Sequence, residues 1–133
     1  MPDIVTHFTN NLKNTDREHN RLKPKAFIHP DTSEISVVCI DTELTLSNAH
    51  EIIFAIGDKI YRSNPRVKAR GDMKVCEIEQ IRYGEENNLS VHVEHAPTEE
   101  IPTHYNIKPE LVDLEFANIC AHRLSRISSL FIK

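Results

Sequence analysis

The run Ile35–Ile40, ISVVCI, is the feature of this chain that most limits how it can fold. It is apolar and rich in β-branched residues, a composition typical of a strand buried inside a sheet. Asp41 and Thr42 follow directly and end the run. The sequence therefore predicts a buried strand near the start of the domain.

A second strand is predicted where Leu89, Val91 and Val93 alternate with polar residues. Such an alternation places apolar side chains on one face and leaves the other face in water. The stretch YGEENN, residues 83–88, precedes this strand and is expected to form a loop. A further strand is expected over 73–79, where apolar residues recur within a short segment.

Two helices are predicted in the first half of the chain. The first covers 2–13, because Ile4, Phe8 and Leu12 would form one helical stripe. The second runs from Ser47, a suitable N-terminal cap, to about residue 60. Its expected inward face consists of Ile52, Ile53, Ile56 and Ile60.

A long helix is predicted at the end of the chain. Pro109 would occupy its first position, and the helix would extend to about Ser128. Its apolar stripe contains Val112, Phe116, Ile119, Cys120, Leu124 and Ile127. Between the second strand and this helix, Pro97, Pro102 and Pro109 are expected to confine 96–108 to loop or edge conformations.

These elements predict an α+β fold, a small and mostly antiparallel sheet covered on one face by two or three helices. We expect an N-terminal helix and polar arm over 1–25 and a single α+β domain over 26–133. The 133 residues include 39% hydrophobic and 27% charged residues, which is ordinary globular composition. A turn is expected at 63–66, SNPR.

The stretch HVEHAPTEEIPTHYNI, residues 92–107, contains the candidate chemistry. On a strand, His92 and Glu94 share one face, and His104 returns after a proline-bounded loop. Two imidazoles and a carboxylate suffice as ligands for zinc or another divalent ion, or as acid–base groups. The alternative is a solvated strand face for His92 and Glu94, with His104 in the proline-bent loop hydrogen-bonding stray backbone carbonyl groups. No other cofactor is expected, because the chain has only three glycines and lacks a phosphate-binding loop.

Charge is unevenly distributed along the chain, whose formal net charge is −4. Residues 77–100 contain seven glutamates against Arg82 alone. The preceding segment 59–74 is basic and could contact phosphate groups of a nucleic acid, although a solvated face is the simpler interpretation. Its cations are Lys59, Arg62, Arg66, Lys68, Arg70 and Lys74.

Four short segments carry a resemblance to a family. They are PKAFIHPDTSEISV (24–37), VCEIEQI (75–81), LSVHVEHAP (89–97) and PTHYNI (102–107). Followed by a long C-terminal helix, they resemble a diffuse group of small uncharacterised bacterial proteins. The resemblance implies a shared fold and a bacterial origin, brings no activity, and favours His104 over His92 and His95. The matching positions are Phe27, Ser36, Val37, Pro97, His104 and Ile107.

The sequence favours a small cytoplasmic accessory protein that binds a protein partner or a second copy of itself. An odd number of dispersed cysteines, Cys39, Cys76 and Cys120, fits reduced thiols, and no signal or membrane-spanning segment is expected. A complete catalytic set is lacking, so an enzyme is not the leading interpretation. One alternative is a metal-assisted hydrolase or nuclease, a toxin or defence component, using His92, Glu94 and His104. The other is nucleic-acid binding through 59–74.

Overall fold

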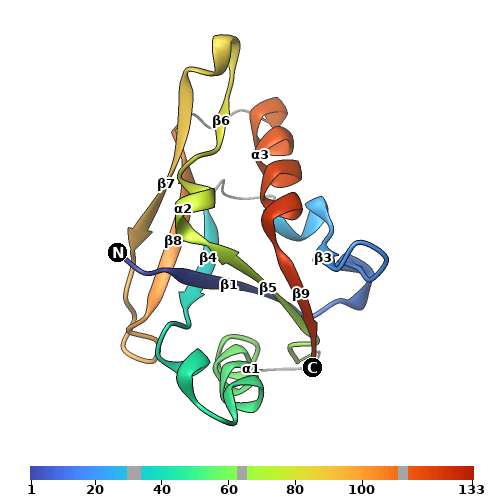
Figure 1. The fold of residues 1–133 in the computed structure, drawn as a ribbon, viewed down its shortest axis with the longest axis vertical. Helices are drawn as coiled ribbons and strands as arrows, with labels where there is room; N and C mark the ends of the chain where they lie inside the picture. The colour runs from blue at the N-terminus through green and yellow to red at the C-terminus, as the bar shows by residue number, and fades with distance from the viewer. Residues whose placement is uncertain (30–33, 63–65, 111–113) are drawn as a thin grey trace.

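The computed structural model describes residues 1–29, 34–62, 66–110 and 114–133. The described residues form an antiparallel sheet with the strand order β6-β7-β8-β4-β1-β5-β9 (Figure 1). The strands are β1 (Ile4–Thr9), β4 (Ile35–Cys39), β5 (Ala69–Lys74), β6 (Arg82–Tyr83), β7 (Leu89–His95), β8 (His104–Pro109) and β9 (Ser129–Ile132). The helices are α1 (Ala49–Ile60), α2 (Val75–Ile78) and α3 (Leu114–Ile127). The predicted α+β class is confirmed, as are the strands at β4 and β7.

The segment predicted as an N-terminal helix is instead the strand β1, so the helix over 2–13 is wrong. β1 pairs with β4 on one side and with β5 on the other. The spacing of Ile4 and Phe8 fits a helix and a strand equally, because residues four apart share a face in both. The strands β4 and β5, which are distant in the sequence, decide between helix and strand, because they pair with the backbone of β1 on both sides.

Residues 10–25 are anchored to the body of the protein. They include the two short strands β2 (Thr15–Asp16) and β3 (Arg21–Leu22), which pair with each other. Leu22 is fully buried, and its backbone exchanges hydrogen bonds with two serines near the end of α3. Ser125 Oγ donates to the Leu22 carbonyl at 2.6 Å, and the Leu22 N–H donates to Ser128 Oγ at 3.1 Å.

The strand expected over 73–79 is shifted. β5 ends at Lys74, and the next residues form the helical turn α2, which buries Val75 and Ile78. These two residues recur three apart, the spacing of one helical face. Earlier in β5, Arg70, Gly71 and Asp72 interrupt the apolar pattern that would have marked the strand.

The prediction that 96–108 is loop or edge is wrong for its second part. β8 lies inside the sheet, between β7 and β4. Its one proline, Pro109, stands opposite Val91, in a pair that exchanges no hydrogen bonds, because the bonded pair is the neighbouring Ser90 and Glu110. The missing N–H of Pro109 therefore costs this ladder nothing.

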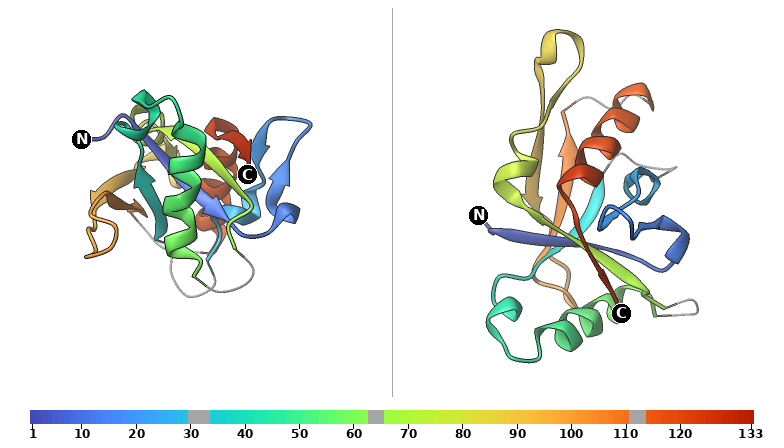
Figure 2. Two further views of the ribbon diagram at one scale, coloured as in Figure 1. Left: turned by 90° about the horizontal axis from the view of Figure 1, so that it is seen from below. Right: turned by 45° about the vertical axis from the view of Figure 1, so that its right-hand side comes forward.

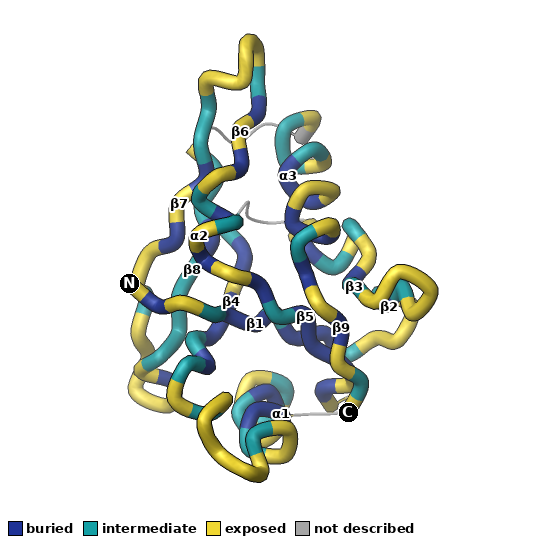
Figure 3. The backbone as a smooth tube through the Cα atoms, viewed as in Figure 1, coloured by how far each residue is buried: buried dark blue, intermediate teal, exposed yellow. Residues whose placement is uncertain are grey.

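The sheet is covered on both faces rather than on one. Val5 and Val37 belong to the core beneath α3, whereas their neighbours in the two strands, Phe8 and Val38, pack beneath α1. Residues an odd number of positions apart in a strand face opposite sides, so α1 and α3 lie on opposite faces. Figure 2 shows β1 and β5 between the two helices, and Figure 3 shows the buried backbone concentrated there.

Both longer helices differ in detail from the prediction. In α1 the buried residues are Ile53, Phe54 and Gly57, whereas Ile60 is 37% exposed. Pro109 belongs to β8 and is therefore not the first residue of α3, which is described over Leu114–Ile127. Within α3, Cys120 and Leu124 are buried as expected. Val112 and residues 63–65 of the predicted turn lie outside the described residues.

Candidate functional site

The predicted ligands His92, Glu94 and His104 lie on one face of β7 and β8 but do not converge. His92 stands opposite Lys108, which is four residues further along β8 than His104. At about 3.3 Å per residue, His92 and His104 are roughly 13 Å apart along the strand. Among the residues that the structure describes, no group of three potential ligands could hold a metal ion. The metal hypothesis stays a prediction, without a ligand cluster among these residues.

His104 is held by hydrogen bonds on both ring nitrogens. Its Nδ1 lies 2.8 Å from the carbonyl oxygen of Ala96, and its Nε2 contacts Ser36 Oγ. A carbonyl oxygen can only accept, so Nδ1 donates and Nε2 accepts the proton of the serine hydroxyl. This arrangement ties β8 to β4 and to the loop after β7, the structural alternative considered for His104.

The exposed face of β7 and β8 carries paired charges. Lys108 Nζ lies 3.1 Å from Glu94 Oε2 and 3.2 Å from Glu34 Oε1. The hydrogen bonds that Lys108 donates to Glu94 and Glu34 raise its pKa. Near the start of β7, the N–H and hydroxyl of Ser90 both donate to Glu110 and lower the pKa of that carboxyl. Three carboxylates against Lys108 and the nearby guanidinium of Arg82 leave this face with a net negative charge.

The basic residues of 59–74 are dispersed over the fold. Arg70 is only 2% exposed and lies between the rings of Phe54 and Phe131, so it cannot contact a phosphate backbone. Arg62 forms an ion pair with Glu100. The exposed members that remain, Lys59, Arg66, Lys68 and Lys74, come from α1, from the loop after it and from the far end of β5. Nucleic-acid binding stays a prediction, and these positions give it no continuous basic strip.

The outer edge of β7 presents backbone groups that have no strand partner among the described residues. Glu110 N–H donates to the Ser90 carbonyl and Ala96 N–H to the His104 carbonyl, so even-numbered residues face β8. The peptide groups of Val91, Val93 and His95 therefore point away from β8. On that side β6 pairs with Leu89 and Ser90. Because Ser90 faces β8, its pair with Arg82 is a non-hydrogen-bonded one, and the bonded position next to it falls on Val91. Beyond Val91, no described strand pairs with Val93 or His95.

A cleft opens where β1 and β4 diverge. Their ladder contains the pairs Val5–Cys39 and Thr6–Val38, and beyond them the ring of His7 fills the gap. His7 Nδ1 lies 2.7 Å from the Ser36 carbonyl oxygen, and Nε2 lies 2.7 Å from the Ala26 carbonyl oxygen. The ring stacks on Phe27 with a centroid distance of 5.1 Å. His7 thus joins β4 to the 3₁₀ turn Pro24–Phe27.

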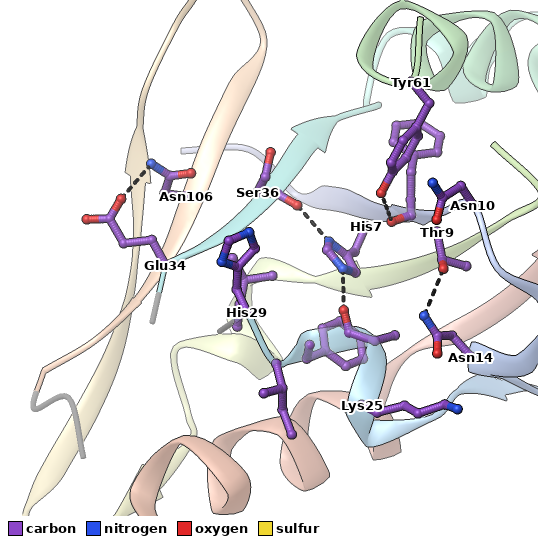
Figure 4. A pocket seen from close by; sticks show the side chains of 15 residues that line it. His7, Thr9, Asn10, Asn14, Lys25, His29, Glu34, Ser36, Tyr61 and Asn106 are labelled. Carbon is purple, nitrogen blue, oxygen red and sulfur yellow. Dashed lines mark hydrogen bonds between the residues drawn. The ribbon is translucent and has the colours of Figure 1, made fainter. Parts of the chain in front are cut away.

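The cleft has a volume of about 390 Å³ and mixed walls. Figure 4 shows Asn10 and Asn14 on one side, His29 and Glu34 on the other, and His7 between them. Desolvation of the enclosed His7 ring lowers its pKa, although both carbonyl contacts oppose this shift. The floor of the cleft is therefore uncharged at neutral pH.

Sequence reasoning missed both the open edge and this cleft. The free peptide groups of β7 have no signature in side-chain chemistry, because they depend on where β6 ends. His7 lies within the segment predicted as a helix, and a helix would place no candidate site residue beside it. If residues 4–9 had been predicted as a strand, His7 would have been placed on the same face as Val5. A histidine on that face is the signal that could have pointed to the cleft.

Comparisons with known proteins give no match: no family model fits the chain, and no curated protein or solved structure is significantly similar to it. Within the described part of the chain, no helix is both long and apolar enough to span a bilayer.

Proposed function

We propose that this protein is an accessory protein that binds a partner protein by accepting an extended segment along the outer edge of β7. The observation that carries this proposal is the pair of outward-facing peptide groups at Val93 and His95, which have no described strand partner. Strand addition to an exposed sheet edge is a recurring mode of peptide recognition, in which main-chain hydrogen bonds supply affinity.

The open edge has defined ends. β6 closes it at Leu89 and Ser90, and Pro97, the next outward-facing position after His95, has no N–H to donate. A partner segment of about five residues fits between these limits, since each outward residue offers one donor and one acceptor. Exposed edges are normally shortened, charged or covered, and β7 is only partly protected, by His92 and Glu94.

The side chains of this face favour a basic partner segment. Glu94 points to the open face, where Glu34 and Glu110 add negative charge and Lys108 offsets part of it. A Lys or Arg placed opposite Glu94 on the added strand would form a favourable cross-strand pair. Residues of the partner segment that lie over the other face would instead meet the apolar side of the sheet.

A second copy of this chain fits the edge less well than another protein. In an antiparallel pairing centred on Val93, Ala96 of one copy would lie opposite Ser90 of the other. That position is already occupied by Arg82, which pairs with Ser90 in β6. A heterologous segment that ends after five residues avoids this overlap.

Hydrogen exchange provides the direct test. In the free protein the N–H groups of Val93 and His95 should exchange rapidly, whereas those of His92 and Glu94, bonded to β8, should be protected. Peptides selected from a random display library should carry Lys or Arg at alternate positions and should slow exchange at Val93 and His95. Protection of His95 in the free monomer would refute an open edge.

A pair of variants at one position isolates the backbone contribution. His95→Pro removes an outward N–H without breaking the bonds to β8, so it should weaken selected peptides about five-fold or more. His95→Gln keeps the N–H and should bind like the wild type. Equal affinity of the two variants would contradict strand addition, and concentration-dependent dimers in light scattering would show a second copy on the edge instead.

The cytoplasm is the compartment that we propose. Cys39, Cys76 and Cys120 are all free thiols, and free thiols persist where the surroundings are reducing.

A further inference from the structure

We propose that the cleft between β1 and β4 is a binding site for a small aromatic carboxylate or phosphate. This inference uses residues on the opposite side of β4 from the β7 edge and does not depend on partner binding. The cleft volume, about 390 Å³, lies within the range of roughly 300–1,000 Å³ that is usual for small-molecule sites.

One wall supplies the polar contacts. Asn10 has no hydrogen bond within the described residues, and Asn14 commits only its Nδ2, which donates to Thr9 Oγ1 at 3.1 Å. Lys25, on the same side of the cleft in Figure 4, forms no ion pair with any described carboxylate. An ammonium group beside two amides is a suitable set of donors for a carboxylate or phosphate.

The opposite wall does not counter this charge. Glu34 is the carboxylate that lines the cleft, and it faces Lys108, 3.2 Å from its Oε1, and Asn106, 3.2 Å from its Oε2. Lys108, which Glu34 shares with Glu94, offsets part of this negative charge from outside the cleft. Lys25 lies beside the amides of the other wall and has no carboxylate partner among the described residues, which favours an anion on that side of the cleft.

The floor is suited to a ring. Phe8 and Phe27 are each 4% exposed and line the cleft, and the His7 ring is stacked on Phe27 with an interplanar angle of 28°. Tyr61 closes the upper side, where its hydroxyl donates to the Phe8 carbonyl at 3.3 Å (Figure 4). Aromatic rings pack favourably in offset or edge-to-face geometry, so a planar ligand gains contact with several of these side chains.

Four probes of equal ring size separate charge from shape: benzoate, phenyl phosphate, benzyl alcohol and benzylammonium. Each is titrated into the ¹⁵N-labelled full chain, with amide shifts of Asn10, Asn14 and 25–29 as the readout. Both anions should shift these signals and bind about five-fold more tightly than benzyl alcohol, because one partly exposed charge pair adds a modest free energy. Benzylammonium should bind more weakly than benzyl alcohol.

Lys25→Met should remove the preference for benzoate over benzyl alcohol while leaving benzyl alcohol binding unchanged. Lys23→Met is the matched control, since Lys23 is exposed and does not line the cleft, and it should retain the preference. The proposal is overturned if no probe shifts these amides, if benzylammonium binds as tightly as benzoate, or if both variants respond alike.

Discussion

His7 Nδ1 lies 2.7 Å from the carbonyl oxygen of Ser36, and the other nitrogen of the same ring faces the carbonyl of Ala26 at the same distance. A neutral imidazole has one N–H and can donate to only one of them, whereas an imidazolium could donate to both. Desolvation of the ring outweighs these contacts, so the pKa of His7 is lowered from 6.5. The folded protein holds His7 neutral.

This relationship predicts a pH dependence of stability. Because the folded pKa lies below the unfolded value, the unfolded chain binds more protons between the two values. The contribution of His7 is complete above about pH 6.5 and declines as the pH falls toward the folded pKa. Urea titrations at pH 7.5, 6.5 and 5.5 should show that the free energy of unfolding falls less on acidification in His7→Gln than in the wild type. The difference should be at most about 1.4 kcal/mol per pH unit. The exposed His122→Gln serves as control and should retain the wild-type slope, and an unchanged slope in His7→Gln would contradict the argument.

Arg70 is the residue of the core whose loss should be most costly. Its Nε lies 3.0 Å from Asp72 Oδ1, and its guanidinium carbon lies 4.4 Å from the centroid of the Phe131 ring. Arg70→Met leaves the carboxylate of Asp72 without its cation at a site where burial already raises the carboxyl pKa. We expect a loss of about 3–5 kcal/mol in the free energy of unfolding, measured with urea.

Two further variants separate the contributions at this site. Arg70→Met combined with Asp72→Asn removes both charges and should recover part of the loss. Phe131→Leu removes only the cation–π contact and should cost about 1 kcal/mol. A double variant less stable than Arg70→Met alone would show that the carboxylate is not the source of the penalty.

Gly57 is required by the approach of α1 to the sheet. A Cβ atom at this position would lie 2.8 Å from Cδ1 of the buried Phe8 ring. Gly57→Ala should therefore destabilise the protein by about 1–3 kcal/mol despite the higher helix propensity of alanine. Phe8→Leu introduced into Gly57→Ala should relieve the overlap between the new Cβ and the ring. It should therefore lower the free energy of unfolding less in that variant than it does in the wild type. Ala55→Gly, on the exposed side of α1, should lose only about 1 kcal/mol.

The three cysteines should differ in reactivity toward iodoacetamide at pH 8. Burial raises the pKa of Cys120 to about 11, and burial also raises that of Cys39. The thiolate is the reactive form, so both should react slowly in the folded protein. The exposed Cys76 should be labelled first, and all three should react in urea. Mass spectrometry of the labelled peptides checks the order, and early labelling of Cys120 would contradict its place in the core.

Local patterns allowed several elements to be predicted. The run at β4 and the alternation at β7 depend on residues within a few positions, and both strands are present. The helices α1 and α3 were also predicted, because a stripe of apolar residues over ten or more positions has one period. The same-face relationship of His92 and Glu94 follows from strand periodicity as well, whereas His104 shares that face because β8 pairs with β7.

Elements whose identity depends on distant partners were not predicted. β1 shares its residue spacing with a helix and becomes a strand because β4 and β5 pair with it. β5 contains Arg70 and Asp72, which a local pattern assigns to the surface, yet they neutralise each other beneath Phe54 and Phe131. β8 accommodates Pro109 beside β7 because that residue falls in a pair without hydrogen bonds, and on the other side the described pairing with β4 begins only at Ile107.

The sequence by itself determined that this chain is α+β, where several of its strands and helices lie, and which faces of them are polar. The tertiary structure alone decided that both faces of the sheet are covered, that His92 and His104 stay apart, and that β7 and the cleft are open. The physical reason is that side-chain periodicity is a local property, readable from neighbours in the chain. Free edges and clefts depend on which distant strands pair with each other and on the residues at which each pairing ends. A local sequence pattern contains neither kind of information.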